Sequence, residues 1–336
     1  MVGKGTVQFM TKPIIAATGV TAGPLEKRKS SFSEYFDKTY DDERLDLQSN
    51  EQGHTQLISD ACEIAMNKVG AAIGEADFLI CGDLVNQMTP SNFAARQLFA
   101  PFIGAFSACA TSVSSLVIAG LLTEVGMSHY ALAGAASQHN AVERQFRYPI
   151  EYGTQKPPTS QWTVTAAGFA VVSPFKEGYP YLHRATIGRV IDYKLTDPLN
   201  MGAAMAPAAF DTLKRHLEAN EGKDIKYDLI MTGDLGKVGS ALLMEMVKQE
   251  ELLTHPNMYL KDAGKEFYGD EPGVIAGASG AGCSAAAYFS EVYTKLMNKT
   301  YKRVLLIATG ALLSPLSFQQ GETIPCIAHA IELISE

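Results

Sequence analysis

The architecture of this chain is set by the stretch Gly104-Ala105-Phe106-Ser107-Ala108-Cys109-Ala110-Thr111-Ser112-Val113-Ser114-Ser115-Leu116-Val117-Ile118-Ala119-Gly120. A cysteine lies among small residues, which let backbone and ligand approach its sulfur closely. The apolar spacing after it predicts a helix that begins near Cys109. The unpaired N–H groups and positive dipole end of a helix start favour a thiolate over a thiol. We therefore expect Cys109 at a pocket, the alternative being a buried structural cysteine.

Composition limits what the chain can do. With 336 residues, 46% of them hydrophobic, and a net charge of −8, it is a globular protein with a large core and no electrostatic case for nucleic acid as partner. The N-terminus lacks the apolar core of a signal peptide, and no run is long enough to span a bilayer. The five cysteines form no CxxC pair and predict free thiols in a reducing compartment; they are Cys62, Cys81, Cys109, Cys283 and Cys326.

Hydrophobic patterns predict alternating strands and helices. The polar residues 20–53 are expected to form a surface insertion, and the aromatic residues 146–162, including Tyr148, Tyr152 and Trp162, a loop. Strands are expected at 13–19, 78–84, 130–136, 166–172 and 186–193, the last two as neighbours. Helices are expected from Leu57 to Val69, at 92–100, after Cys109 and at 202–219.

The second half of the chain repeats the first. Residues 227–235 match 77–84 and share Gly-Asp-Leu, 280–289 form another small-residue helix start, and 303–311 match 130–136. The repeat predicts two similar α/β halves, 1–200 with the Cys109 turn and 201–336, whose sheets are parallel in their centres. Neither half carries the glycine pattern of a dinucleotide site.

The Cys109 turn, the duplicated halves and the turn at 277–281 together resemble the thiolase and ketoacyl-synthase superfamily. The resemblance implies an α/β fold of two pseudo-equivalent halves in an αβαβα layering, and a homodimer. Condensing enzymes of that superfamily also use two histidines, or a histidine and an asparagine. Thr232 and Val274 stand at the matching positions of this chain. Because valine can neither donate nor accept a side-chain hydrogen bond, the resemblance implies a fold without condensing machinery and no enzyme activity.

The histidines are scattered and predict no zinc site. His329 is expected either in a late loop that returns to Cys109 or as a structural residue of a C-terminal helix. His139 is expected in a surface loop. The other histidines are expected at the surface; they are His54, His129, His183 and His216.

Asp83 and its repeat partner Asp234 each follow a predicted strand. Ligands collect at the carboxyl ends of strands in open α/β sheets, so the repeat places a carboxylate near the pocket in each half. The alternative for each aspartate is a structural cap on the following turn.

A narrower resemblance, running nearly end to end, is to the thiolase-fold stage V A-series sporulation proteins of endospore formers. It is carried by the Cys109 turn, the missing histidines, Gly-Asp-Leu-Gly-Lys-Val-Gly at 233–239 and the ending Pro-Cys-Ile-Ala-His at 325–329. It implies non-enzymatic binding of pyridine-2,6-dicarboxylic acid (dipicolinate), free or as its calcium chelate, for uptake into the developing spore. It also implies a peripheral place on the inner spore membrane with other stage V A-series proteins, and no cofactor.

A small planar dianion suits a helix N-terminus, where N–H groups and the dipole attract carboxylates. The expected ligand-binding residues are Asp83, Ser107, Cys109, Thr111, Ser112 and His329. Asp83 would repel a dianion unless calcium bridges the two. Two alternatives remain open: an acyl-transfer enzyme of the ketoacyl-synthase type with Cys109 as nucleophile and His329 as partner, and a scaffold with no small-molecule site.

Overall fold

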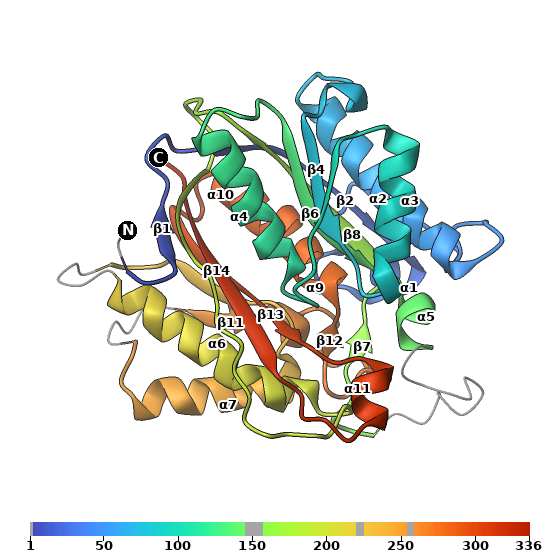
Figure 1. Ribbon diagram of the computed structural model, residues 1–336, viewed down its shortest axis with the longest axis vertical. Helices are drawn as coiled ribbons and strands as arrows, with labels where there is room; N and C mark the ends of the chain where they lie inside the picture. Colours follow the sequence, from blue (N-terminus) through green and yellow to red (C-terminus); the bar gives the residue numbers. More distant parts are fainter. Residues whose placement is uncertain (1–2, 145–156, 220–224, 254–258) are drawn as a thin grey trace.

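Two α/β halves with the same order of elements build the molecule (Figure 1). The computed structural model describes residues 3–144, 157–219, 225–253 and 259–336; Tyr148, Tyr152 and most of the loop expected at 146–162 lie outside them. The first half comprises β2 (Ile14–Ala22), α2 (Asn50–Lys68), β4 (Phe78–Gly82), α3 (Thr89–Leu98), β5 (Phe102–Gly104), α4 (Thr111–Glu124), β6 (Ala131–Ser137) and β8 (Ala166–Ser173). The second comprises β9 (Tyr181–Thr186), α6 (Met201–Glu218), β10 (Leu229–Thr232), α7 (Gly236–Gln249), β11 (Leu260–Asp262), α9 (Ala281–Ala287), β13 (Arg303–Ala311) and β14 (Cys326–Ile334).

Short elements decorate these halves. Residues 157–160 run as turns into β7 (Trp162–Thr163), whose two residues pair with β12 (Ala278–Ser279). The short elements are β1 (Thr6–Gln8), α1 (Pro24–Lys29), β3 (Lys38–Thr39), α5 (His139–Glu143), β7 (Trp162–Thr163), α8 (Ala263–Glu266), β12 (Ala278–Ser279), α10 (Tyr293–Met297) and α11 (Pro315–Gln319).

Strand order shows the duplication directly. The sheet runs β5-β4-β6-β8-β2 in the first half and β11-β10-β13-β14-β9 in the second, and the two meet at a single pair, Ile14 with Tyr181. In this strand order the second half begins with β9, which precedes residue 200. The division of the chain into 1–200 and 201–336 stays a prediction.

The sheets are mixed, which corrects two strand expectations. β5, β4 and β6 are parallel, as are β11, β10 and β13, but along this strand order β8, β2, β14 and β9 are antiparallel to their neighbours. The strand expected at 186–193 ends at Thr186 instead, and β2 separates it from β8. Residues 187–193 leave the sheet because they connect β9 to α6 over the end of β14, where Ile191 bridges Cys326.

Five layers stack α on β on α on β on α. The small residues of α4 and α9 allow them to lie between the sheets in a central apolar cluster that takes in side chains from both halves, such as Leu116 and Ala286. A second cluster packs α2 and α3 on the outer face of the first sheet, and a third packs α6 and α7 on the second. Figure 1 shows α4 in front of the strands and the outer helices on opposite sides. The expected αβαβα layering is confirmed.

A shared aspartate clamp marks the starts of equivalent strands. Asp77 precedes β4, and its Oδ2 accepts from the backbone N–H groups of His129 and Tyr130 at 2.7 and 3.0 Å. Asp228 precedes β10, and its Oδ2 accepts from those of Lys302 and Arg303 at 2.8 and 3.0 Å. The repeat therefore extends to individual hydrogen bonds.

Several residues expected at the surface are buried. Within 20–53, Phe32 packs in the central cluster. Glu26 is only 1% exposed, and its carboxyl accepts hydrogen bonds from the backbone N–H of Thr165 at 3.0 Å and from the Tyr268 hydroxyl. His54 and His216 are fully buried, the latter with its Nδ1 2.9 Å from the Thr186 hydroxyl oxygen.

The remaining histidines lie nearer the surface. His129 is exposed, as predicted, and His183 is half-buried. His139 is also half-buried, because it begins α5 and stacks on Trp162 with ring centroids 4.1 Å apart.

Candidate functional site

The turn before α4 holds Cys109 in a strained, compact conformation. Ala108 has φ +49°, a left-handed backbone that non-glycine residues rarely adopt and that clusters at functional sites. The Thr111 hydroxyl donates to the Ala108 carbonyl at 2.7 Å and accepts from the Ser107 backbone N–H at 3.1 Å. Cys109 stands two residues before the first residue of α4 and is 7% exposed.

The second half closes over this turn. A Cβ added to Gly310, on β13, would lie only 2.3 Å from the Ser107 carbonyl oxygen, so only glycine permits the approach. The Ser112 and Ser284 hydroxyl oxygens lie 2.7 Å apart and join α4 to α9. The site is thus built at the junction of the two halves, with Cys109 at its centre.

Asp234 is the carboxyl group that faces Cys109. It follows β10, is 1% exposed, and accepts from the Thr309 hydroxyl at 2.8 Å and from the Gly280 backbone N–H at 3.0 Å. The same carboxyl interacts with the Cys109 thiol and raises its pKa. Burial raises the pKa of Asp234 to about 7, although its hydrogen bonds oppose this shift.

The cysteine is a thiol rather than an activated thiolate. Burial raises the pKa of Cys109 well above its ordinary value, and the negative charge of Asp234 raises it further. Burial and the charge of Asp234 therefore oppose the thiolate that the start of α4 is expected to favour.

His329 reaches the turn from β14, neither from a loop nor from a helix. The ring is 5% exposed and lies between two partners, the Gly188 backbone N–H, which donates to Nδ1 at 3.1 Å, and the Ser107 hydroxyl oxygen, 3.2 Å from Nε2. Since Nδ1 accepts, the neutral ring carries its hydrogen on Nε2 and donates it to Ser107. Burial lowers the pKa of His329 to about 4.

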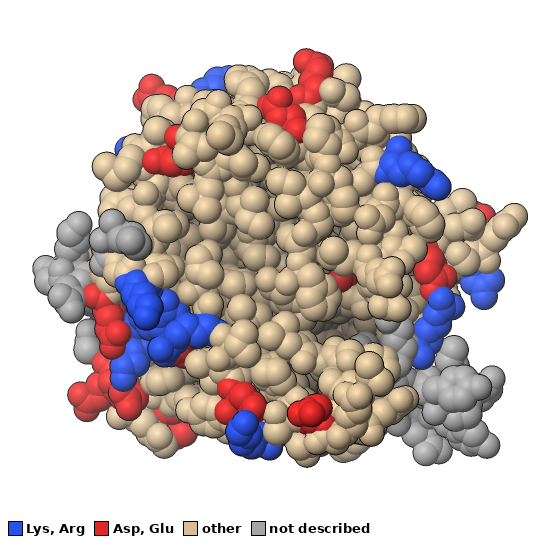
Figure 2. All heavy atoms as spheres, in the orientation of Figure 1, with Lys and Arg blue, Asp and Glu red and all other residues tan. Residues whose placement is uncertain are grey.

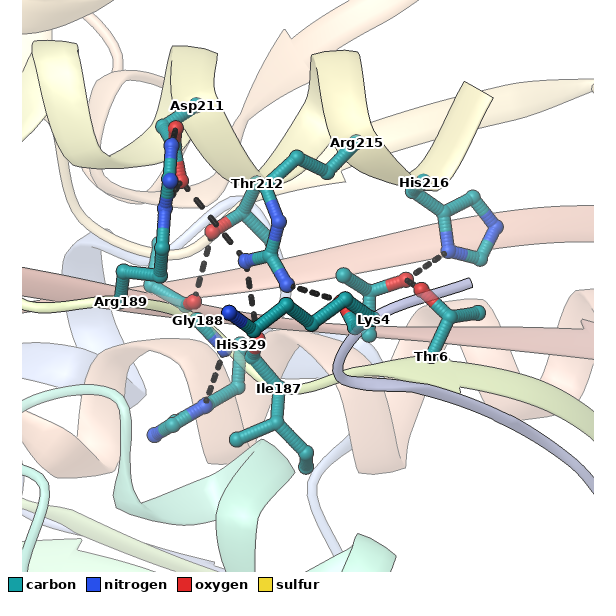
Figure 3. A network of polar contacts seen from close by, with 12 residues as sticks. Lys4, Thr6, Ile187, Gly188, Arg189, Asp211, Thr212, Arg215, His216 and His329 are labelled. Atoms are coloured by element: carbon teal, nitrogen blue, oxygen red, sulfur yellow. Dashed lines mark hydrogen bonds and ion pairs between the residues drawn. The ribbon is translucent and has the colours of Figure 1, made fainter. Parts of the chain in front are cut away.

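A surface network holds the segment that contains Gly188 (Figure 3). Arg215 donates to the carbonyl oxygens of Ile187 at 3.0 Å and of Lys4 at 2.6 Å. The residue after Gly188, Arg189, pairs with Asp211 on α6. These contacts fix the backbone on both sides of Gly188 and, through it, the orientation of the His329 ring.

The structure brings together three of the six predicted ligand residues, Ser107, Cys109 and His329. Thr111 and Ser112 lie beside them, but their hydroxyls serve the turn and the α4–α9 contact. Asp83 is fully buried in its own strand-to-helix connection, where it accepts from the Val85 and Ser91 backbone N–H groups at 2.7 and 2.9 Å.

The positions matched to the superfamily histidines have structural contacts of their own. The Thr232 hydroxyl donates to Asp262 at 2.7 Å, and Val274 is buried in the central cluster. The residue that faces Cys109 from the end of β10 is Asp234, two residues further along.

Two residues of the site are absent from the six predicted ligand residues. Asp234 is expected only near the pocket, and Gly188 is not predicted at all. The repeated Gly-Asp pointed to Asp234, whereas Gly188 had no signal, because its role depends on a backbone N–H. Within the described residues no group of three or more His, Cys, Asp or Glu side chains could hold a metal ion. All five cysteines are free and buried.

The face that carries α4 has few charged side chains. Figure 2 shows charged side chains around the rim of this face and few in its middle, over α4 and β14. Leu121 on α4 is 40% exposed, and Val125, directly after α4, is 64% exposed. Among the described helices, none combines the length and the apolar character needed to cross a membrane.

Comparison with known proteins agrees with this architecture. The chain resembles the 3-oxoacyl-[acyl-carrier-protein] synthase III of Aquifex aeolicus VF5 (13% identity, 96% of this chain and 99% of that one, TM-score 0.57). It also resembles human mitochondrial 3-ketoacyl-CoA thiolase (12% identity, 98% and 99%, TM-score 0.55) and the acetamide-bound OleA of Xanthomonas campestris (12% identity, 98% and 100%, TM-score 0.57). At these identities the likeness shows a thiolase-like fold and nothing more.

Sequence similarity is more specific. Residues 3–334 match the family profile described as stage V sporulation protein AD. The stage V sporulation protein AD of Bacillus subtilis (strain 168) is 40% identical over 331 residues, which cover 98% of this chain and 97% of that protein. A thiolase-like fold, a buried cysteine turn at the junction of its halves and this end-to-end match lead to one conclusion: the chain belongs to the stage V sporulation protein AD family.

Proposed function

We propose that this sporulation protein binds dipicolinate beside the Cys109 turn without chemically transforming it. The observation that carries the proposal is the chemical state of the turn. A buried, protonated thiol beside Asp234 and a neutral histidine whose Nε2–H is donated to Ser107 are poorly prepared to attack a thioester, whereas the Ser107 hydroxyl can donate a hydrogen bond to an anion.

The alternative, acyl transfer by Cys109 with His329 as its base, is disfavoured by two contacts. Nε2 of His329 addresses Ser107 rather than the thiol, and Nδ1 is occupied by Gly188. A general base must reach the proton that it removes. Incubation with acyl-CoA followed by mass spectrometry tests this alternative, because a stable acyl group on Cys109 would establish it.

The donors suited to a dicarboxylate are few. Because His329 donates to the Ser107 oxygen, the Ser107 hydroxyl hydrogen is left to donate to a ligand carboxylate. The start of α4 adds the positive end of its dipole. Burial raises the pKa of Asp234 to about 7, so below about pH 7 its carboxyl is mostly neutral and adds little repulsion to a bound anion. If dipicolinate binds as its calcium chelate, the calcium ion would offset the charge of the dianion.

The proposal places the protein peripherally on the inner spore membrane, where it would hand dipicolinate to other stage V A-series proteins during its uptake into the developing spore. Family membership supports the sporulation setting. A second copy of the chain is the expected further partner.

Calorimetric titration tests the proposal. Dipicolinate, with and without calcium, is compared with isophthalate, which keeps the two carboxylates but lacks the ring nitrogen. We expect saturable binding of dipicolinate that weakens about tenfold in Ser107→Ala and Cys109→Ala. Ser114→Ala is the matched control, since that hydroxyl donates within α4, to the Thr111 carbonyl at 3.1 Å. No binding under either condition, or equal binding of isophthalate, would refute it.

A further inference from the structure

A basic hollow lies at the end of the second sheet remote from Cys109. Two open cavities of about 560 and 610 Å³ adjoin there and share Lys226 and Asp228. Lys299, Lys302 and Arg303 line the first, and Lys261, Thr300 and Tyr301 line the second. Each volume is in the range of small-molecule sites.

The positive charge of this hollow is largely uncompensated. Lys226, Lys299 and Lys302 are exposed and have no ion-pair partner among the residues that the structure describes. The facing carboxylates are already engaged: Asp228 accepts from two backbone N–H groups, and Glu336 accepts from the Tyr181 hydroxyl at 2.7 Å and pairs with Lys12. In a chain of net charge −8, this concentration of lysine is a local exception.

The first half has the same backbone here but not the same charges. The aspartate clamp is equivalent, yet Glu75 stands two residues before Asp77 where Lys226 stands two before Asp228. Gly126 lies four residues before Tyr130, and Lys299 lies four residues before Arg303, so the two positions are equivalent in the repeat. Gly126 has φ +74° and Lys299 has φ +60°. A left-handed lysine costs about 1 kcal/mol or more relative to glycine. The second half therefore keeps a lysine where the geometry favours the glycine of the first.

We propose that this hollow binds a phosphorylated anion through Lys226, Lys299 and Lys302. Ammonium groups that form no ion pair with the protein's own carboxylates are available to bind multivalent phosphate, and the Thr300 hydroxyl supplies an uncharged donor at the same place. The phosphate belongs either to a lipid headgroup at a membrane surface or to a soluble molecule. The site is separate from the Cys109 turn, because most of β13, roughly 20–25 Å of strand, lies between Lys302 and Gly310.

The test uses Lys299→Gly combined with Lys302→Ser. The first change installs the residue of the other repeat at a left-handed position, so the variant should unfold no more easily than the wild type. The matched control, Lys176→Ser with Lys248→Ser, removes the same charge from exposed lysines elsewhere. Binding of inorganic pyrophosphate is measured by calorimetry, and co-sedimentation is measured with vesicles of phosphatidylglycerol or of phosphatidylcholine.

We expect the wild type and the control to bind at least one anionic probe, and the double variant to bind it at least fivefold more weakly. Binding of pyrophosphate alone would identify a soluble phosphorylated ligand, and binding of phosphatidylglycerol but not phosphatidylcholine vesicles a membrane surface. The proposal is overturned if neither anionic probe binds, or if the double variant and the control lose binding equally. Dipicolinate titration of the same variants is expected to be unchanged, which separates this site from the Cys109 turn.

Discussion

The backbone N–H of Gly188 donates to Nδ1 of His329 at 3.1 Å, so the tautomer of a side chain at the site is set by a residue with no side chain of its own. In Gly188→Ala the new Cβ would lie 1.8 Å from the Ala328 carbonyl oxygen, and the segment must move. We expect the pKa of His329 to rise from about 4 toward its ordinary value and dipicolinate binding to weaken. NMR titration of the imidazole measures the change. Gly74→Ala, with nothing within 4 Å of its Cβ, is the control.

Cys109 should be slow to react with iodoacetamide. Because burial and Asp234 raise the pKa of its thiol, little thiolate is present at pH 7, and alkylation should be at least tenfold slower than that of a free cysteine peptide. Mass spectrometry of the intact protein over pH 6–9 gives the rate. Asp234→Asn should speed the reaction, and a wild-type rate equal to that of the peptide would contradict the assignment of a thiol.

Asp234 should make the protein less stable as the pH rises from about 4 to about 7. Its folded-state pKa of about 7 exceeds the unfolded value of 3.8, so within this window the unfolded chain has released a proton that the folded chain still holds. The free energy of unfolding therefore falls through the window, by at most about 1.4 kcal/mol per pH unit. Urea unfolding of Asp234→Asn from pH 4 to pH 8 should show a flatter profile. A parallel pair of profiles would exclude this role.

The sequence predicted the layers and the duplication because they rest on local patterns. Short apolar runs became β4, β6, β10 and β13, and small-residue stretches became the central helices α4 and α9. The strand expected at 186–193 was misplaced because Ile187 to Tyr193 are apolar enough for a strand but have to cross over the end of β14. Hydrophobicity alone cannot distinguish a strand from an apolar crossover.

The site could be predicted only in part. The cysteine turn is a continuous stretch, so Ser107 and Cys109 could be found, and His329 was suspected from its place in the chain. Its neutral state could not be predicted, because burial and the Gly188 N–H arise only in the folded chain. Likewise His54 and His216 gave no sign of burial, since one histidine in a mixed pattern can face either way.

A second copy of the chain is expected to pair at β5, the edge strand of the first sheet. Two exposed phenylalanines flank this strand, Phe99 at 90% and Phe106 at 56%. Phe99→Glu with Phe106→Glu should weaken a dimer at least tenfold by placing charge on that edge, with little change in unfolding temperature. Analytical ultracentrifugation over a range of concentrations measures this. Phe175→Glu, at 52% exposure and away from β5, should leave the association unchanged, and a monomeric wild type would refute the prediction.

The aspartate clamp offers a test of the duplication at the level of single bonds. Asp77→Asn replaces a carboxylate that accepts two backbone hydrogen bonds by an amide that accepts them less strongly, and should lower the free energy of unfolding by about 1 kcal/mol at pH 7. The hydrogen bond from the Tyr130 backbone N–H, more than any other contact, lowers the pKa of Asp77. Its contribution is therefore present above the unfolded pKa, near 4, and disappears as the pH falls through the lower folded value.

If the halves are energetically as well as topologically equivalent, Asp228→Asn should cost a similar amount at pH 7, because its Oδ2 accepts the same pair of bonds at the start of β13. Urea unfolding of the two single variants and of the double variant measures both costs. We expect them to add, since the clamps share no partner. If only one of the two variants has a lower free energy of unfolding, the clamp stabilises only that strand pair. The two halves would then share the geometry of the clamp but not its energetic contribution.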